Sequence, residues 1–315
     1  MSPKKLVVTI VASCIALVCA LGLFATDVQQ QNGSWTVQPS DEPGKVRFAL
    51  LQHWKGHSNN HESDWSTNSF EGLDLSVKAK HEVKFTIRRD AGRFECEGYV
   101  EDSEGAGVFH FFPDGKYATS MSALGFSVDP DKIFAMAIFD VSVDFAQEMK
   151  NLKLRNLDSD KLIAFRIFGV DAKFIQEIRK EGLNTDDSDK LVAFRIHGVS
   201  PEFVRSVRGA GYTPGEDDLI AMRIHGATPE WMAQLKKEGY DHIELQKLIA
   251  FRIHGVSPEF IDKIESLGYK HPEPDQLIAM RIHGVTPEFI SNLKSRGMKD
   301  LTIDQLVSLR IHGID

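Results

Sequence analysis

Three histidines near the N-terminal third of the chain have the type and spacing that a metal site requires. They are His53, His57 and His61. On a helix, this four-residue spacing would place three imidazoles on one face, beside Glu62. The stretch from 56 to 68, GHSNNHESDWSTN, is however rich in Gly, Ser and Asn, and these residues favour a polar loop over a helix. We therefore expect no bound metal and no other cofactor, and these histidines are the candidate ligands if one is bound.

A second set of histidines recurs at a fixed interval, each before the Gly of His-Gly-Val or a close variant. Its members are His197, His225, His254, His283 and His312, separated by 28 or 29 residues. Stacked helices lie about 8–10 Å apart, whereas zinc lies about 2 Å from its ligands, so successive copies cannot share one ion. A histidine in the last helical turn favours the helix dipole and can cap carbonyls. Because Phe168 and Phe139 occupy the same position in earlier copies, we expect a structural role.

An arginine stands two residues before each of these histidines and before Phe168. This arginine ladder comprises Arg166, Arg195, Arg223, Arg252, Arg281 and Arg310, and Ala137 replaces it in the first copy. Repeated surface cations could bind acidic partners. Alternatively, each guanidinium pairs with a nearby carboxylate or with carbonyls at a helix end, and we favour this second interpretation. The arginines from Arg195 onward and the five histidines are the candidates for an interaction face.

Catalytic signatures are missing from the sequence. His61-Glu62 and His81-Glu82 lack the second His of a zinc-peptidase helix. Ser291 and Lys294 have the Ser-x-x-Lys spacing but lie within a repeat and have no partner motif. The formal net charge of −8 gives no reason to expect nucleic acid as a partner. We predict that the protein is not an enzyme.

The repeated unit reads as two short helices. The first begins at an Asp suited to N-capping (Asp160, Asp189, Asp218, Asp275 or Asp304) and ends at the Gly after His, with the next apolar residue completing a Schellman-type cap. The second begins with Ser or Thr, Pro and Glu, as in 257–259, which is typical of an N-cap, a first-turn proline and a first-turn carboxylate. The first helix is apolar around most of its circumference, so we expect neighbouring helices to cover it on several sides.

Stacking of such units predicts an α-solenoid of about seven two-helix repeats of 28–29 residues at 113–315. Residues 34–112 differ, because apolar side chains alternate around Val46, Val83 and Phe109 with turn-rich links between them. This alternation predicts a small antiparallel sheet of about four to six strands. The fold class is therefore α+β and multidomain, with a β-rich domain before the helical repeats.

The N-terminal 26 residues carry a targeting signal. Lys4 and Lys5 precede an uncharged apolar run at 6–25, which is long enough to span a bilayer core about 30 Å thick. The lysines favour a cytoplasmic N-terminus, so a short linker at 27–33 and all that follows would be extracytoplasmic. Residues 1–26 are predicted to be a signal anchor; a cleaved signal peptide or a lipidation site at Cys14 are alternatives. Each would place the chain at the cell envelope or in the periplasm.

The repeat sequence LIAMRIHGVTPEFI at 277–290 resembles repeats of bacterial envelope proteins. Among these are the C-terminal regions of some relatives of the BlaR/MecR antirepressor metallopeptidases, which sense antibiotic or envelope stress. The region 89–107, with RDAG, EG and GAG, also resembles the β-rich segment before those repeats. The multi-span membrane part and the His-Glu-x-x-His helix are absent from this sequence. The resemblance therefore implies an envelope accessory or sensory module without peptidase activity.

Three functions follow from these features. The first is a membrane-tethered scaffold whose solenoid docks a protein or another envelope partner. The second is a metal-binding or enzymatic β-rich domain, with the repeats as a spacer. The third is a self-assembling structural element, since a solenoid end without a cap can stack on another copy. We favour the first function.

Overall fold

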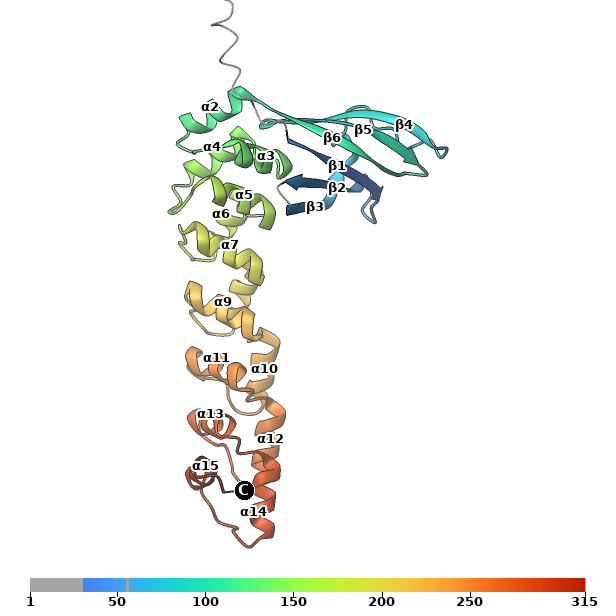
Figure 1. The fold of residues 1–315 in the computed structure, drawn as a ribbon. Helices are drawn as coiled ribbons and strands as arrows, with labels where there is room; N and C mark the ends of the chain where they lie inside the picture. The colour runs from blue at the N-terminus through green and yellow to red at the C-terminus, as the bar shows by residue number, and fades with distance from the viewer. Residues whose placement is uncertain (1–30, 55–56, 315) are drawn as a thin grey trace, which may run out of the picture. The chain divides into compact units, whose positions relative to one another are not determined.

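The protein is described by a computed structural model that covers residues 31–54 and 57–314. This part of the chain contains a six-stranded antiparallel sheet followed by 14 helices, which is an α+β fold with an N-terminal β domain and a helical C-terminal part (Figure 1). Backbone contacts divide it into two compact units. The first runs to Asn151 and includes Asp158–Arg166, and the second comprises Leu152–Leu157 and the chain from Ile167 onward.

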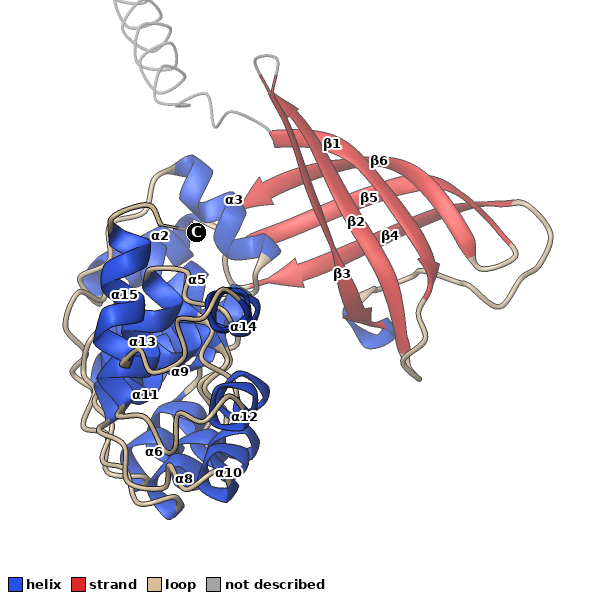
Figure 2. Ribbon diagram, turned by 90° about the horizontal axis from the view of Figure 1, so that it is seen from below, coloured by secondary structure: helices blue, strands red, loops and turns tan. Residues whose placement is uncertain are grey.

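The sheet has the strand order β3-β2-β1-β6-β5-β4, and the neighbouring strands are antiparallel. Figure 2 shows the six strands side by side, with α3 near one end of the sheet. The strands are β1 Gln31–Pro39, β2 Lys45–Trp54, β3 His57–Ser66, β4 His81–Arg89, β5 Gly92–Glu101 and β6 Glu104–Pro113. Strand β1 thus begins inside the segment that the sequence assigned to a linker.

The polar loop predicted at 56–68 is wrong, because β3 occupies most of this stretch and a 3-10 helix (Thr67–Ser69) follows it. The outer part of β3 alternates in exposure: Glu62 and Asp64 are exposed, whereas Trp65 is buried. Trp65 packs against Phe48 of β2, with ring centroids 5.4 Å apart. The apolar strand β2 therefore pairs with a polar neighbour and forms with it the edge of the sheet.

The core of the sheet is aromatic, and two glycines make room for its central tryptophan. The Trp35 indole donates a hydrogen bond from Nε1 to the carbonyl oxygen of Glu97 at 3.2 Å. A Cβ at Gly107 would lie 2.7 Å from that nitrogen, and a Cβ at Gly98 would lie 2.8 Å from the same indole. Glycine at both positions therefore lets the ring lie flat across β5 and β6.

The first helices pack against this sheet. Phe134 of α3 (Pro130–Ile138) contacts three aromatic rings of β5 and β6, those of Phe94, Phe109 and Phe111. Asp90, in the turn between β4 and β5, accepts a hydrogen bond from the backbone amide of Val143 at 3.0 Å. The Asp-containing turn thus fixes the start of α4 (Val143–Asn151) and joins the sheet to the helices that follow it.

The helices after the sheet alternate between the two kinds that the repeat predicted. First-type helices correspond to the first helix of the repeated unit, and second-type helices correspond to the second. The first-type helices after α3 are α5 Ser159–Phe168, α7 Ser188–His197, α9 Glu216–His225, α11 Leu245–His254, α13 Pro274–Ile282 and α15 Ile303–Ile311. The second-type helices are α2 Gly115–Ala123, α4, α6 Ala172–Lys180, α8 Pro201–Gly209, α10 Pro229–Lys237, α12 Pro258–Ser266 and α14 Pro287–Ser295. Within the second unit, α7, α9, α11, α13 and α15 contact one another in succession.

The second-type helices begin as predicted. The side chains of Ser200, Thr228, Ser257 and Thr286 are N-caps that accept a hydrogen bond from the backbone amide three residues later, and proline follows each of them. The Schellman-type ends are also confirmed. Gly255, for example, has φ of 74°, and the amide of Val256 donates to the carbonyl of Phe251 at 2.7 Å.

The predicted N-caps of the first-type helices are wrong. Asp160, Asp189, Asp218, Asp275 and Asp304 lie inside the first turn instead. The caps precede them: Asp187 caps α7 and Thr302 caps α15. These aspartates still suit their positions, because a carboxylate in the first turn interacts favourably with the helix dipole.

Candidate functional site

The arginine ladder binds the end of the preceding first-type helix. Nε of Arg223 donates to the carbonyl oxygen of His197 at 3.2 Å, and Nε of Arg252 donates to that of His225 at 2.9 Å. The same bond joins Arg166 to Phe139, Arg195 to Phe168 and Arg281 to His254. Each of these five arginines thus reaches the end of the first-type helix one repeat earlier and satisfies a carbonyl that the helix leaves free.

Two further contacts hold each guanidinium in place. It stacks on an aromatic ring in the first turn of a second-type helix, with its central carbon 4.6–5.2 Å from the ring centroid. These rings belong to Phe145, Phe174, Phe203, Trp231, Phe260 and Phe289. From Arg195 onward the guanidinium also lies against the glycine that ends the preceding first-type helix; a Cβ at Gly226, for example, would be 2.8 Å from Nη2 of Arg252. Arg166, which has Asp140 in place of this glycine, pairs with its carboxylate at 3.1 Å. The arginines therefore join consecutive repeats, with a carbonyl rather than a carboxylate as their shared partner.

The five recurring histidines, which stand two residues after arginines of the ladder, do not converge on a common centre. His197, His225 and His254 contribute their backbone carbonyls to the arginines, and their rings are half-buried or exposed. The ring of His312 donates from Nδ1 to the carbonyl of Ser308 at 2.8 Å, which is the predicted helix-end contact. His283 is exposed at the same position as the others. Each histidine is thus placed by its own helix end.

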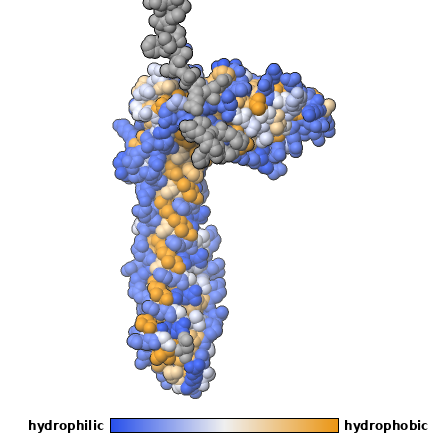
Figure 3. Space-filling model, viewed as in Figure 1, coloured by the Kyte–Doolittle hydropathy of each residue, from blue (hydrophilic) through white to orange (hydrophobic). Residues whose placement is uncertain are grey.

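Directly after each arginine of the ladder stands an isoleucine that points away from the protein. This isoleucine row comprises Ile167, Ile196, Ile224, Ile253, Ile282 and Ile311, whose exposed fractions lie between 48% and 58%. Figure 3 shows apolar side chains gathered along this part of the chain. The sequence did not predict the row, because a helix that is apolar around most of its circumference is expected to be covered by its neighbours on several sides. The structure covers the faces that carry Leu191 and Phe194 and leaves the Ile196 face open.

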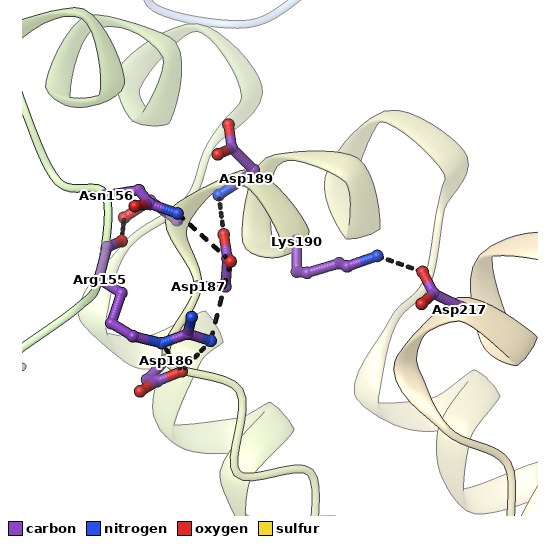
Figure 4. Close-up of polar contacts among 8 residues, drawn as sticks. Arg155, Asn156, Asp186, Asp187, Asp189, Lys190 and Asp217 are labelled. Atoms are coloured by element: carbon purple, nitrogen blue, oxygen red, sulfur yellow. Dashed lines mark hydrogen bonds and ion pairs between the residues drawn. The ribbon is translucent and has the colours of Figure 1, made fainter.

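Carboxylates gather near the N-terminal ends of the same helices. This acidic edge comprises Asp189, Glu216, Asp217, Asp218, Glu244, Glu273, Asp275 and Asp304. Lysines partly neutralise it; for example, Lys190 pairs with Asp217 of the next first-type helix, and Lys247 pairs with Asp275 at 2.8 Å. Figure 4 shows the Lys190 pair together with the contacts around Asp187.

The loop before α7 joins this edge. Arg155 binds Asp186 at 2.8 Å and lowers the pKa of that carboxyl through a side-chain hydrogen bond (Figure 4). The backbone of the same loop is bound as well, since the amide of Arg155 donates to the carbonyl of Asp186. These contacts fix the carboxylates of the loop close to the start of α7.

The three histidines of the β domain do not lie on one helix. His53 is in β2, and His57 and His61 are in β3, where the register pairs His53 with Ser58 and Leu50 with His61. The ring of His61 lies against Phe139 at 4.5 Å and is 3.3 Å from the hydroxyl of Ser63. Burial lowers its pKa. Among the residues that the structure describes, no group of three His, Cys, Asp or Glu side chains could hold a metal ion.

The segment predicted as signal anchor or signal peptide, 1–26, lies outside the described residues. In residues 31–54 and 57–314, no helix is both long and apolar enough to cross a membrane. Comparisons of the chain with models of known protein families, with curated proteins and with solved structures find no match.

Proposed function

We propose that the helix pairs form an α-solenoid that docks a protein partner through the isoleucine row. The observation that carries the proposal is the row itself, in which one half-exposed isoleucine recurs at the same position of each first-type helix from α5 to α15. Single exposed apolar residues are ordinary on a protein surface. A periodic row of them on helices that contact one another in succession is typical of a binding surface.

The contacts between repeats support the solenoid part of the proposal. Each arginine ties a first-type helix to the preceding one and also to an aromatic ring of the second-type helix between them. Because the same contacts recur at Arg195, Arg223, Arg252 and Arg281, each repeat meets its neighbour in the same way. Such uniform junctions propagate into a regular stack, and the row then runs along it.

The energetics of the row are those of reversible docking. Burying a fully exposed isoleucine contributes about 1.5–3 kcal/mol, so the exposed half of each one contributes about 0.8–1.5 kcal/mol. Five of them give roughly 4–8 kcal/mol, whereas association costs about 4–15 kcal/mol in lost motional freedom. The row therefore supplies apolar contact, and charged groups beside it must add to the affinity and the specificity.

The proposal places this scaffold in the bacterial envelope, outside the cytoplasm. The apolar run at 6–25 behind two lysines supports export, either as an uncleaved anchor or as a signal peptide. The proposal also assigns no catalytic role, since the sequence lacks the motifs of known nucleophiles and metal peptidases. The resemblance of the repeats to those of envelope proteins is in keeping with both statements.

Photo-crosslinking in intact cells tests the proposal. A photoreactive residue at Ile224 should give a discrete crosslinked product, and one at Gln234, exposed on α10, should not. The variant I196S/I282S removes two distant isoleucines of the row and should abolish the product formed from position 224. The matched variant V77S changes an apolar side chain that is similarly exposed in the β domain and should leave the product intact. Equal products from positions 224 and 234 would refute a role for the row.

A further inference from the structure

We propose that the partner of the isoleucine row is a basic amphipathic helix. Its apolar side chains would recur at heptad spacing, and lysines or arginines would run along one of its flanks. This inference rests on the proposed docking function and names the chemistry of the partner. It follows from three properties of the row, which are its spacing, the charge at one of its sides and the mixed charge at the other.

The spacing of the row fits an α-helix laid along the stack. Packed helices lie about 8–10 Å apart, so successive isoleucines such as Ile224 and Ile253 are separated by about that distance. An α-helix advances about 1.5 Å per residue, and side chains seven positions apart are therefore about 10.5 Å apart on one face. A partner helix with one large apolar side chain every seven residues can place one between each pair of isoleucines.

The charge on one side of the row selects a basic flank. Asp189 and Ile196 are seven residues apart and thus lie on the same face of α7, two turns from each other. Ala193 lies between them, and its small side chain leaves the space over the middle of the helix open. A partner helix over the isoleucines would therefore have the acidic edge about 10 Å to one side, within reach of a lysine or arginine side chain.

The other side of the row has no comparable excess of either charge. Here the arginines, which are held by carbonyls, stand beside the first-turn glutamates of the second-type helices. Arg223, for example, is close enough to Glu230 to contribute to the lowering of its pKa. Only one flank of the partner is therefore selected for charge, which also fixes the direction in which the partner helix can lie.

The same charges disfavour two other occupants. In a face-to-face dimer with antiparallel stacks, the acidic edge of one copy would lie opposite that of the other, and in the parallel arrangement it would meet the mixed edge without gain. A membrane surface with anionic headgroups would be repelled by the acidic edge. A separate basic helix is the occupant for which the apolar row and the acidic edge are both complementary.

Designed peptides of 21 residues test this chemistry on the full-length chain in nanodiscs of neutral lipid. The first peptide has leucine at heptad positions and lysine along one flank. A second has glutamate in place of lysine, and a third keeps lysine but has serine in place of leucine. Fluorescence anisotropy should show that the first peptide binds at least tenfold more tightly than the other two, and that its affinity falls as salt increases from 50 to 300 mM.

Variants of the protein locate the binding. I224S/I253S should weaken the first peptide at least tenfold, while V77S leaves its affinity unchanged. E216Q/E244Q removes two charges of the acidic edge at the N-terminal ends of α9 and α11, the helices that carry Ile224 and Ile253, and should weaken the lysine peptide about threefold to fivefold without weakening the glutamate peptide. D262N, at an exposed position of α12, is the matched charge control. Circular dichroism verifies that each variant keeps its helical content.

Several results would overturn the inference. Equal affinity for the lysine and glutamate peptides would show that the partner needs no basic flank. If neither peptide bound, the partner would not be an amphipathic helix of this kind. A dimer seen by sedimentation and lost in I224S/I253S would assign the row to a second copy. Binding to anionic vesicles that depends on the row would assign it to lipid. If crosslinks from position 224 persist in any of these cases, the proposed docking function stands. Only the inference that the partner is a basic amphipathic helix is then refuted.

Discussion

The Nε atom of Arg252 lies 2.9 Å from the carbonyl oxygen of His225, 27 residues earlier in the chain. This bond connects the last turn of α9 to the last turn of α11. The same guanidinium stacks 5.1 Å from the ring centroid of Trp231, in the second-type helix between them. One side chain therefore joins three consecutive helices, and the residue that follows it, Ile253, is half exposed.

Removing this junction should destabilise the helical part. R252M deletes a hydrogen bond from a charged donor and a cation–π contact but keeps much of the aliphatic stem. The expected loss in the free energy of unfolding is about 1–3 kcal/mol. Urea titration followed by circular dichroism measures it. R252K should recover only part of the loss, because an ammonium lacks the planar fork, and K263M on the exposed face of α12 should have little effect. A midpoint that is unchanged in R252M would contradict the role assigned to the ladder.

The helix-end glycines should tolerate no side chain. Gly255 has φ of 74°, and a Cβ there would lie 2.8 Å from Nη2 of Arg281. G255A should therefore lower the free energy of unfolding by about 1–3 kcal/mol, through backbone strain and displacement of the arginine. Gly209 supplies the control, because it lies in helix α8 and nothing is within 4 Å of its added Cβ. G209A should stabilise the protein by up to about 1 kcal/mol. Equal effects at the two positions would rule out this explanation.

The first-turn glutamates should make stability depend on pH in the acidic range. Hydrogen bonds from its own backbone amide and from Thr228 lower the pKa of Glu230 below the usual 4.5, and Glu202 and Glu288 are held in the same way. A carboxyl with a lowered folded-state pKa stabilises the fold fully above its unfolded pKa, and this stability is lost as pH falls through the folded value. The melting temperature should thus be steady from pH 7 to 5 and fall below about pH 4.5.

Substitution of these glutamates checks the cause of that fall. E202Q/E230Q/E288Q should melt at a lower temperature at pH 7 and lose less stability than the unmodified chain on going to pH 3.5. E148Q, at an exposed position of α4, controls for the general loss of a negative charge. Parallel curves for the triple variant and the unmodified chain would show that other groups cause the acid transition.

The sequence predicted the local structure of the repeats well wherever a short-range pattern controls it. Ser257 and Pro258 start a helix and Gly255 ends one, because capping depends on a few adjacent residues. The cap of the first-type helix was misplaced, because Asp275 suits the first turn as well as the cap and Glu273 and Pro274 already begin the helix.

Features that depend on distant residues could not be predicted in this way. Strand β3 lacks an apolar alternation along most of its length, and its pairing depends on β2 and on Trp65. The exposure of Ile253 is a similar case. The sequence of an apolar helix indicates that neighbouring helices must cover it. Which face stays uncovered depends on the direction in which those neighbours stack, and contacts such as that of Arg252 set this direction.

The affinity of the crosslinked partner for the isoleucine row tests the central claim most directly. The partner identified from position 224 would be purified and titrated against the unmodified chain, I224S/I253S and V77S by calorimetry. The account predicts binding to the unmodified chain and V77S with the same dissociation constant, and binding at least tenfold weaker to I224S/I253S. The same dissociation constant for all three proteins would contradict it.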